Sequence, residues 1–183
     1  GGAAPLLRRH VLPVGPVQPR LAEGVGRAQV EDLDRAVLAE EDVAGAKVAV
    51  LDLNPEASDR VAKSIGGLAV TCDVSSAKSV GDAFQNVRSQ LGPIDILVNN
   101  AGIAPLTRLD VLETTPESFD RVLAVNTRGT FFLTQCFARH MVRQRRGPVA
   151  PAIIFISSMS AEVSSPTRAE YCISKAALSQ AAA

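Results

Sequence analysis

The sequence predicts an α/β fold in which a doubly wound parallel sheet carries helices on both faces. Two observations support this prediction. From Gly45 onward, short and nearly continuous apolar segments alternate with longer segments whose apolar residues recur at helical spacing. Polar and small residues follow directly after the apolar segments, at the sheet edge where ligands bind in such folds.

The apolar segments define the expected strands. They cover residues 47–52, 68–72, 94–98 and 153–157. A first helix is expected over residues 54–65, because Pro55 suits the first helical position. A second helix follows residues 73–76 and ends at Gly92-Pro93, which is a strong stop signal.

The remaining helices are less uniform. One is expected from Thr115-Pro116 to about residue 146, with a break or join near Asn126, and the last begins at Ala169. Residues 1–44 depart from the pattern, because a proline at every third position from 13 to 19 removes the donors that a central strand needs. We expect residues 1–44 to be a disordered or divergent segment, with helical spacing over 30–44, and residues 45–183 to form the regular domain.

Composition excludes several classes of protein. The 19 basic residues balance 19 acidic ones, so a nucleic-acid binder that relies on a basic surface is not expected. No apolar run reaches the roughly 18 residues of a membrane span. A membrane protein is therefore not expected. The three cysteines are too few and too widely spaced for a disulfide framework or a zinc site, so no metal is expected either, and a reducing, cytoplasmic setting fits best.

Two acidic residues follow strands of the predicted sheet. Asp52 can accept hydrogen bonds from both hydroxyls of an adenosine ribose and would repel a 2′-phosphate, which favours NAD over NADP. The alternative is a residue that only shapes the turn at the strand end. Asp73 can meet an adenine amino group, or it can cap the helix that follows.

The segment after the third strand reads Asn99-Asn100-Ala101-Gly102. Its two amides can tie strand ends together, and the small Ala-Gly pair lets a ligand approach the backbone closely. As an isolated tetrapeptide, the segment could equally be a turn.

The most informative group is Ser158, Tyr171 and Lys175. Tyr171 and Lys175 are four residues apart at the start of a helix, so they share one helix face. An ammonium group nearby stabilises a phenolate, which makes tyrosine usable as a general acid–base. Ser158 follows the fourth strand at the same sheet edge, where its hydroxyl can hold a carbonyl oxygen in line with the tyrosine proton.

Together these motifs resemble the short-chain dehydrogenase/reductase family, in its shorter, single-domain type. The resemblance covers residues 45 to about 180 and rests on residues 51–52, 72–74, 95–102, 126, 157–158 and 171–175. It implies a Rossmann-like fold and reversible hydride transfer between NAD or NADP and a carbonyl or secondary alcohol. Similarity of residues 153–178 to 3-oxoacyl-[acyl-carrier-protein] reductases adds a 3-oxoacyl thioester to the small-molecule substrates to consider, beside sugars, steroids and small alcohols.

The resemblance also implies roles for the site residues. Tyr171 would exchange the proton, Lys175 would hold the nicotinamide ribose, Ser158 would orient the substrate oxygen, and Asn126 would support a proton relay. Asp73 and Val74 would line the adenine pocket, with Asn100 to Gly102 beside the adenosine ribose. The catalytic candidates are Ser158, Tyr171, Lys175 and Asn126. The cofactor-binding candidates are Asp52, Asp73, Val74, Asn99, Asn100, Ala101, Gly102, Tyr171 and Lys175.

The chain departs from the family pattern at both ends. The phosphate-binding motif Thr-Gly-x-x-x-Gly-x-Gly is not recognisable, and only Gly24 and Gly26 resemble its end. The helix of Tyr171 stops about two turns past Lys175, so the expected fold is incomplete on that side too. An alternative is therefore an inactive fragment that binds cofactor weakly or not at all. The Asn-Asn-Ala-Gly segment argues against a nucleotide-sugar epimerase, and full-length relatives would be homo-oligomers.

Overall fold

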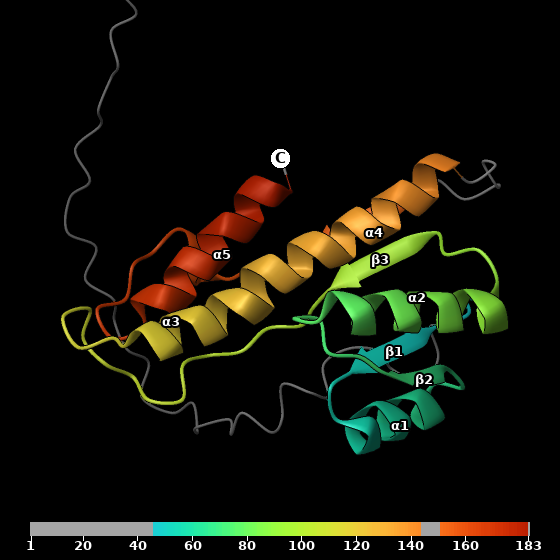
Figure 1. The fold of residues 1–183 in the computed structure, drawn as a ribbon, viewed down its shortest axis with the longest axis horizontal. Helices are drawn as coiled ribbons and strands as arrows, with labels where there is room; N and C mark the ends of the chain where they lie inside the picture. Colours follow the sequence, from blue (N-terminus) through green and yellow to red (C-terminus); the bar gives the residue numbers. More distant parts are fainter. Residues whose placement is uncertain (1–45, 144–150, 183) are drawn as a thin grey trace, which may run out of the picture. The chain divides into compact units, whose positions relative to one another are not determined.

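The computed structural model describes residues 46–143 and 151–182, all within one compact unit that spans Leu38–Ala183 (Figure 1). The predictions for residues 1–44, including Gly24 and Gly26, lie outside the described residues. The strands are β1 (Ala49–Asp52), β2 (Leu68–Thr71), β3 (Ile96–Asn99) and β4 (Ala152–Phe155). The helices are α1 (Pro55–Ser64), α2 (Ala77–Leu91), α3 (Pro116–Leu123), the π-helix η2 (Ala124–Gly129), α4 (Thr130–Arg143), the 3-10 helix η3 (Met159–Ala161) and α5 (Ala169–Ala181).

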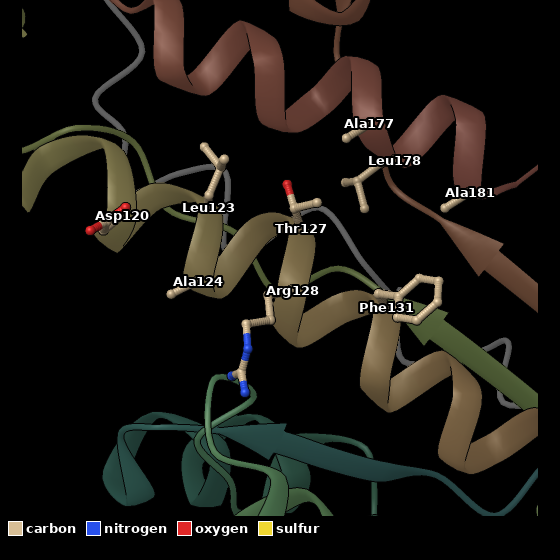
Figure 2. Close-up of a pocket in the computed structure, with 9 residues that line it drawn as sticks. All are labelled: Asp120, Leu123, Ala124, Thr127, Arg128, Phe131, Ala177, Leu178 and Ala181. Carbon is tan, nitrogen blue, oxygen red and sulfur yellow. The ribbon is translucent and has the colours of Figure 1, made fainter. Parts of the chain in front are cut away.

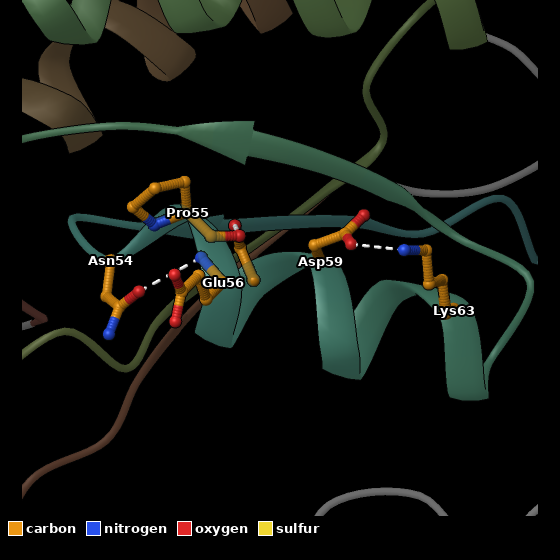
Figure 3. Close-up of polar contacts among 6 residues, drawn as sticks. Asn54, Pro55, Glu56, Asp59 and Lys63 are labelled. Carbon is orange, nitrogen blue, oxygen red and sulfur yellow. Dashed lines mark hydrogen bonds and ion pairs between the residues drawn. The ribbon is translucent and has the colours of Figure 1, made fainter.

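Local signals determine where the helices begin and end. Asn54 caps α1, because its Oδ1 accepts hydrogen bonds from the backbone N–H groups of Glu56 at 2.9 Å and Ala57 at 3.3 Å. An ion pair between Asp59 and Lys63 joins successive turns of the same helix (Figure 3). Ser76 caps α2, which ends at Gly92 with a φ of 91°, a conformation that favours glycine.

All strand pairs that the structure describes are parallel, which confirms the predicted fold class. β1 pairs with β2 from Ala49↔Leu68 onward, and β3 pairs with β4 from Ile96↔Ala152 onward. Within the described ranges these are two separate two-stranded sheets, whereas the sequence predicted one sheet. In the doubly wound order 3-2-1-4-5, the two pairs correspond to strands 3-2 and 4-5, between which the first strand would lie.

Helices cover the β1–β2 pair on both sides. Figure 1 shows α1 on one side of this pair and α2 on the other. A core of apolar side chains from β2, α2 and α4 fills the space between these elements: Val70, Cys72, Val80, Ala83, Val87 and Leu133. Helix α4 packs on β3 and α2, so the core joins the two strand pairs through helices.

One face of the β3–β4 pair is left uncovered by the described residues. Val98 and its register partner Ile154 are 51% and 45% exposed, and alternate residues on the same strands are exposed as well. The opposite face is packed, since Asn99 is buried there and donates a hydrogen bond to Thr134 of α4. In the part of the chain that the structure describes, no helix has the length and hydropathy of a membrane span.

Candidate active site

The predicted site residues gather at the carboxyl ends of the strands. Asp52 ends β1, Asn100 follows β3, and Ser158 follows β4. In parallel α/β sheets this edge is where ligands bind. Helices α5 and η2 bring the remaining candidates, Tyr171 and Asn126, to the same region.

Tyr171 lies between two cationic side chains of its own helix segment. The ring centroid is 5.8 Å from Lys175 Nζ and 5.5 Å from Arg168 Cζ, which matches their positions one turn after and one turn before Tyr171. Lys175 is buried and donates a hydrogen bond from Nζ to the Ile156 carbonyl at 2.9 Å. Burial lowers the pKa of Lys175 below its ordinary value. The ammonium is therefore anchored beside the phenol, as the helical spacing predicted.

Ser158 is oriented by the backbone that follows it. Its Oγ accepts a hydrogen bond from the Ser160 N–H at 3.1 Å, as the N-cap of η3. This bond occupies a lone pair and leaves the hydroxyl proton available to a substrate oxygen. Because η3 packs against α5, Ser158 is held on the side of the sheet edge that faces Tyr171's helix.

Asn126 lies in the π-helix η2, where the sequence predicted a break or join. The side chain is fully buried, and its Oδ1 accepts a hydrogen bond from the Ile103 N–H at 2.7 Å. Its Nδ2 donates to the Ile103 carbonyl and to Ser174 Oγ, each at 2.9 Å. Ser174 in turn donates to the Tyr171 carbonyl at 2.7 Å. Asn126 thus ties the loop after β3 to the helix that carries Tyr171, and π-helical turns are frequent at functional sites.

Gly102 marks the point where these segments converge. A Cβ atom placed at Gly102 would lie 3.4 Å from Lys175 Nζ and 3.5 Å from Asn126 Oδ1. A side chain here would fill the space in front of both groups, whereas glycine keeps the backbone open to a ligand. Ala101 and Gly102 are exposed, which fits the predicted close approach of a cofactor.

Asn99 and Asn100 have different surroundings. Asn99 is buried, and its Nδ2 donates to Thr134 Oγ1 at 3.0 Å, so its side chain ties β3 to α4 rather than to another strand. Backbone hydrogen bonding continues past the strand, since the Ile156 N–H donates to the Asn99 carbonyl at 3.0 Å. Asn100 is exposed at the sheet edge.

Both acidic candidates make local hydrogen bonds. The exposed Asp52 accepts one from the Asn54 N–H at 2.8 Å, which is the turn-forming alternative. Asp73 accepts from the N–H and hydroxyl of Ser75 at 2.9 and 2.7 Å, while Ser76 caps the following helix. In each carboxylate these bonds use Oδ1, so Oδ2 makes no hydrogen bond to the described residues.

Sequence reasoning missed the contacts that place the loop of Asp73 and Val74 against η2. A Cβ atom on Gly129 would lie 2.7 Å from the Val74 carbonyl oxygen, so only glycine fits. Arg128 donates from a guanidinium nitrogen to the Ser75 carbonyl at 3.0 Å. The spacing Asn-x-x-Gly from Asn126 to Gly129 is the one sequence signal that could have pointed to this packing.

A cavity of about 490 Å³ lies elsewhere, between α5 and the helical run formed by the end of α3, η2 and the start of α4 (Figure 2). Its lining is mostly apolar and contains none of the predicted site residues: Asp120, Leu123, Ala124, Thr127, Arg128, Phe131, Ala177, Leu178 and Ala181. In Figure 2 the Arg128 side chain points away from this space, toward the loop of Ser75.

Comparisons with known proteins find similar proteins over most of the chain. A family model described as enoyl-(acyl carrier protein) reductase matches residues 24–183. The sorbitol dehydrogenase of Cereibacter sphaeroides is 36% identical over 159 residues, which are 86% of this chain and 57% of that protein. The chain spans about half the length of the curated relatives it matches.

Solved structures are similar over the same region. The 3-oxoacyl-[acyl-carrier protein] reductase of Brucella melitensis in complex with NAD aligns with a TM-score of 0.66 and 34% identity, over 73% of this chain and 54% of that one. A gluconate 5-dehydrogenase from Burkholderia cenocepacia in complex with NADP and tartrate aligns with a TM-score of 0.66 and 32% identity, over 75% and 53%.

Proposed function

The chain belongs to the short-chain dehydrogenase/reductase family, and from this premise we propose that its protein transfers hydride reversibly between a nicotinamide cofactor and a secondary alcohol or carbonyl. The observation that carries the proposal is the phenol of Tyr171 beside the anchored ammonium of Lys175. A phenol held at this position can act as the general acid–base of such a reaction.

A nicotinamide cofactor, when bound, would provide the hydride acceptor or donor of the proposed reaction. The Ser158 hydroxyl donates a hydrogen bond to the substrate oxygen and orients that oxygen toward Tyr171. In alcohol oxidation Tyr171 accepts the proton of the substrate hydroxyl. In carbonyl reduction Tyr171 donates a proton to the substrate oxygen. Asn126 keeps the backbone of Tyr171 in place through Ser174, which makes it a positioning residue.

We propose that the cofactor extends along the exposed strand ends. Asp52, Asn100 and Gly102 are exposed there, and Gly102 has no side chain that would stand between a ligand and the Lys175 and Asn126 side chains. Asp73 and Val74 would meet the adenine, and Asn99 to Gly102 would follow the ribose. The carboxylate of Asp52 favours NAD over NADP, because it would repel a 2′-phosphate.

The substrate stays within a broad class. Similarity to 3-oxoacyl-carrier-protein reductases supports a 3-oxoacyl thioester, and similarity to sorbitol and gluconate dehydrogenases supports small polyols and sugar acids. We also propose a cytoplasmic protein that forms homo-oligomers. The exposed Phe131 and the apolar cavity of Figure 2 support an interface at the start of α4 and the end of α5.

Calorimetric titration with NADH and NADPH tests the cofactor assignment. We expect binding weaker than micromolar, because no glycine-rich phosphate motif is recognisable before Asp52. NADH should bind more tightly than NADPH, and Asp52→Ala should remove the difference. Tighter binding of NADPH would contradict the role of Asp52, and no binding of either at millimolar concentration would favour the inactive alternative.

A further inference from the structure

Arg168 is the N-cap residue of α5 and lies directly beside the proposed general acid–base. Its guanidinium carbon is 5.5 Å from the centroid of the Tyr171 ring. Residues 168, 171 and 175 share one face of the helix, so both cations lie near the ring of Tyr171. Neither the sequence motifs nor the proposed proton transfer requires a cation at position 168.

No carboxylate among the described residues pairs with Arg168. The two ion pairs found within residues 46–143 and 151–182 lie on α1 and α2. The nearest acidic residue along the chain, Glu170, is buried and accepts a hydrogen bond from the Ser118 hydroxyl at 2.8 Å instead. Arg168 Nε is itself buried and has no hydrogen-bond partner among the described residues. Burial leaves Nε without an acceptor, which is costly, and it fixes the guanidinium in place. Arg168 as a whole is half-buried, so its other N–H donors can meet a ligand acceptor.

The hydrogen-bond donors of the Arg168 guanidinium indicate which chemical group it would bind. Its planar array of N–H donors matches the two oxygens of a carboxylate, and a charge-assisted pair of this kind is stronger than a neutral hydrogen bond. Because Arg168 lies against the Tyr171 ring, a carboxylate bound there can belong to the same small molecule as a carbonyl or hydroxyl held by Ser158 and Tyr171.

We propose that Arg168 binds the carboxylate of the substrate and that the protein acts on short hydroxy acids or the corresponding keto acids. This proposal rests on the proposed function and narrows its substrate class. Uncharged polyols and thioesters would leave the guanidinium without an acceptor and would bind less tightly. Arg168 is then a residue that determines specificity, in addition to any packing against the tyrosine ring.

Tyr171 supplies a local probe, because the chain has one tyrosine and no tryptophan. Tyrosine fluorescence of the 183-residue chain is titrated with 3-hydroxybutyrate and, separately, with its uncharged methyl ester, without cofactor and at 0.15 M KCl. We expect the carboxylate to bind at least about tenfold more tightly than the ester, as one charge-assisted contact predicts. Equal binding of the two compounds, or no binding of the carboxylate at 100 mM, would overturn the proposal.

Variants separate binding from packing. Arg168→Gln should abolish the preference for the carboxylate, Arg168→Lys should keep part of it, and Arg60→Gln, on the exposed side of α1, should leave it unchanged. A preference that survives in Arg168→Gln, while circular dichroism shows a folded chain, would assign Arg168 to ring packing only and overturn the proposal. These titrations need no cofactor, so a failure of NADH binding or turnover would count against the proposed function alone.

Discussion

The region around Tyr171 and the exposed strand ends are built in different ways. Asn126, Ser174 and Lys175 are at most 5% exposed, and hydrogen bonds connect them to three separate segments of the chain. The side chains of Asp52 and Asn100, in contrast, are exposed, and the Asp52 carboxylate accepts its one hydrogen bond from the Asn54 N–H, two residues away. Folding alone therefore orders the proton-transfer groups, whereas the exposed side chains of Asp52 and Asn100 make few contacts with the rest of the fold.

Removing the buried amide of Asn126 should lower the stability of the fold more than any change at the exposed strand ends. Asn126→Ala deletes three hydrogen bonds and leaves the part-buried N–H and carbonyl of Ile103 without these partners. We expect a loss of about 2–4 kcal/mol in the free energy of unfolding, measured by urea denaturation. Asn100→Ala is the matched control at the exposed edge, and its effect should stay below about 0.5 kcal/mol. Equal effects of the two variants would contradict the contrast between the regions.

Gly129→Ala tests the packing of η2 against the loop of Asp73 and Val74. A methyl group in Gly129→Ala would meet the Val74 carbonyl oxygen at 2.7 Å, so η2 or the loop of Asp73 must shift. We expect a loss of about 1–3 kcal/mol in thermal or urea unfolding. Gly81→Ala in α2 has open space around the new methyl group and should instead stabilise by roughly 0.5–1 kcal/mol. A neutral Gly129→Ala variant would show that this packing is loose.

A smaller effect concerns the pH dependence of stability. Burial lowers the pKa of Lys175 below its ordinary value of 10.5, so the unfolded chain binds this proton more readily than the folded one. The free energy of unfolding should therefore gain from Lys175 as pH rises from the lowered pKa toward 10.5, and Lys175→Met should remove that gain.

The comparison of the two proteins across this pH range isolates Lys175. Burial also raises the pKa of the Cys72 thiol, which stabilises the fold at neutral pH and loses that effect above pH 9.0. Both proteins carry Cys72, so its contribution cancels in the difference. Urea midpoints measured at several pH values up to 10.5 provide the test, and parallel curves would contradict the effect assigned to Lys175.

Local signals explain what the sequence could predict. Pro55 and Gly92 set helix ends, apolar runs set the strands to within two residues, and the polar interruption at Asn126 coincides with a π-helix. These features depend on neighbours along the chain. The placement of Ser158 after a strand and of Tyr171 and Lys175 on one helix was equally predictable, whereas the chemistry assigned to them stays a prediction.

Contacts between distant segments were not predictable. Arg128 reaches the Ser75 carbonyl across 53 positions of sequence, and Asn99 bonds to Thr134 rather than to a strand. The division of the described strands into two pairs also depends on backbone pairing that apolar periodicity does not encode. The position of Arg168 over the Tyr171 ring likewise needed three-dimensional coordinates, since a helical spacing alone would fit a solvated face.

The central claim is that Tyr171 performs proton transfer in hydride exchange. It is tested most directly by NADH oxidation at millimolar NADH with a set of carbonyl substrates, comparing the unaltered chain with Tyr171→Phe. The account predicts turnover of at least one substrate by the unaltered chain and a loss of at least about 100-fold in the variant, with the fold retained. Turnover that persists in Tyr171→Phe above a few per cent, or no turnover by the unaltered chain, would contradict it.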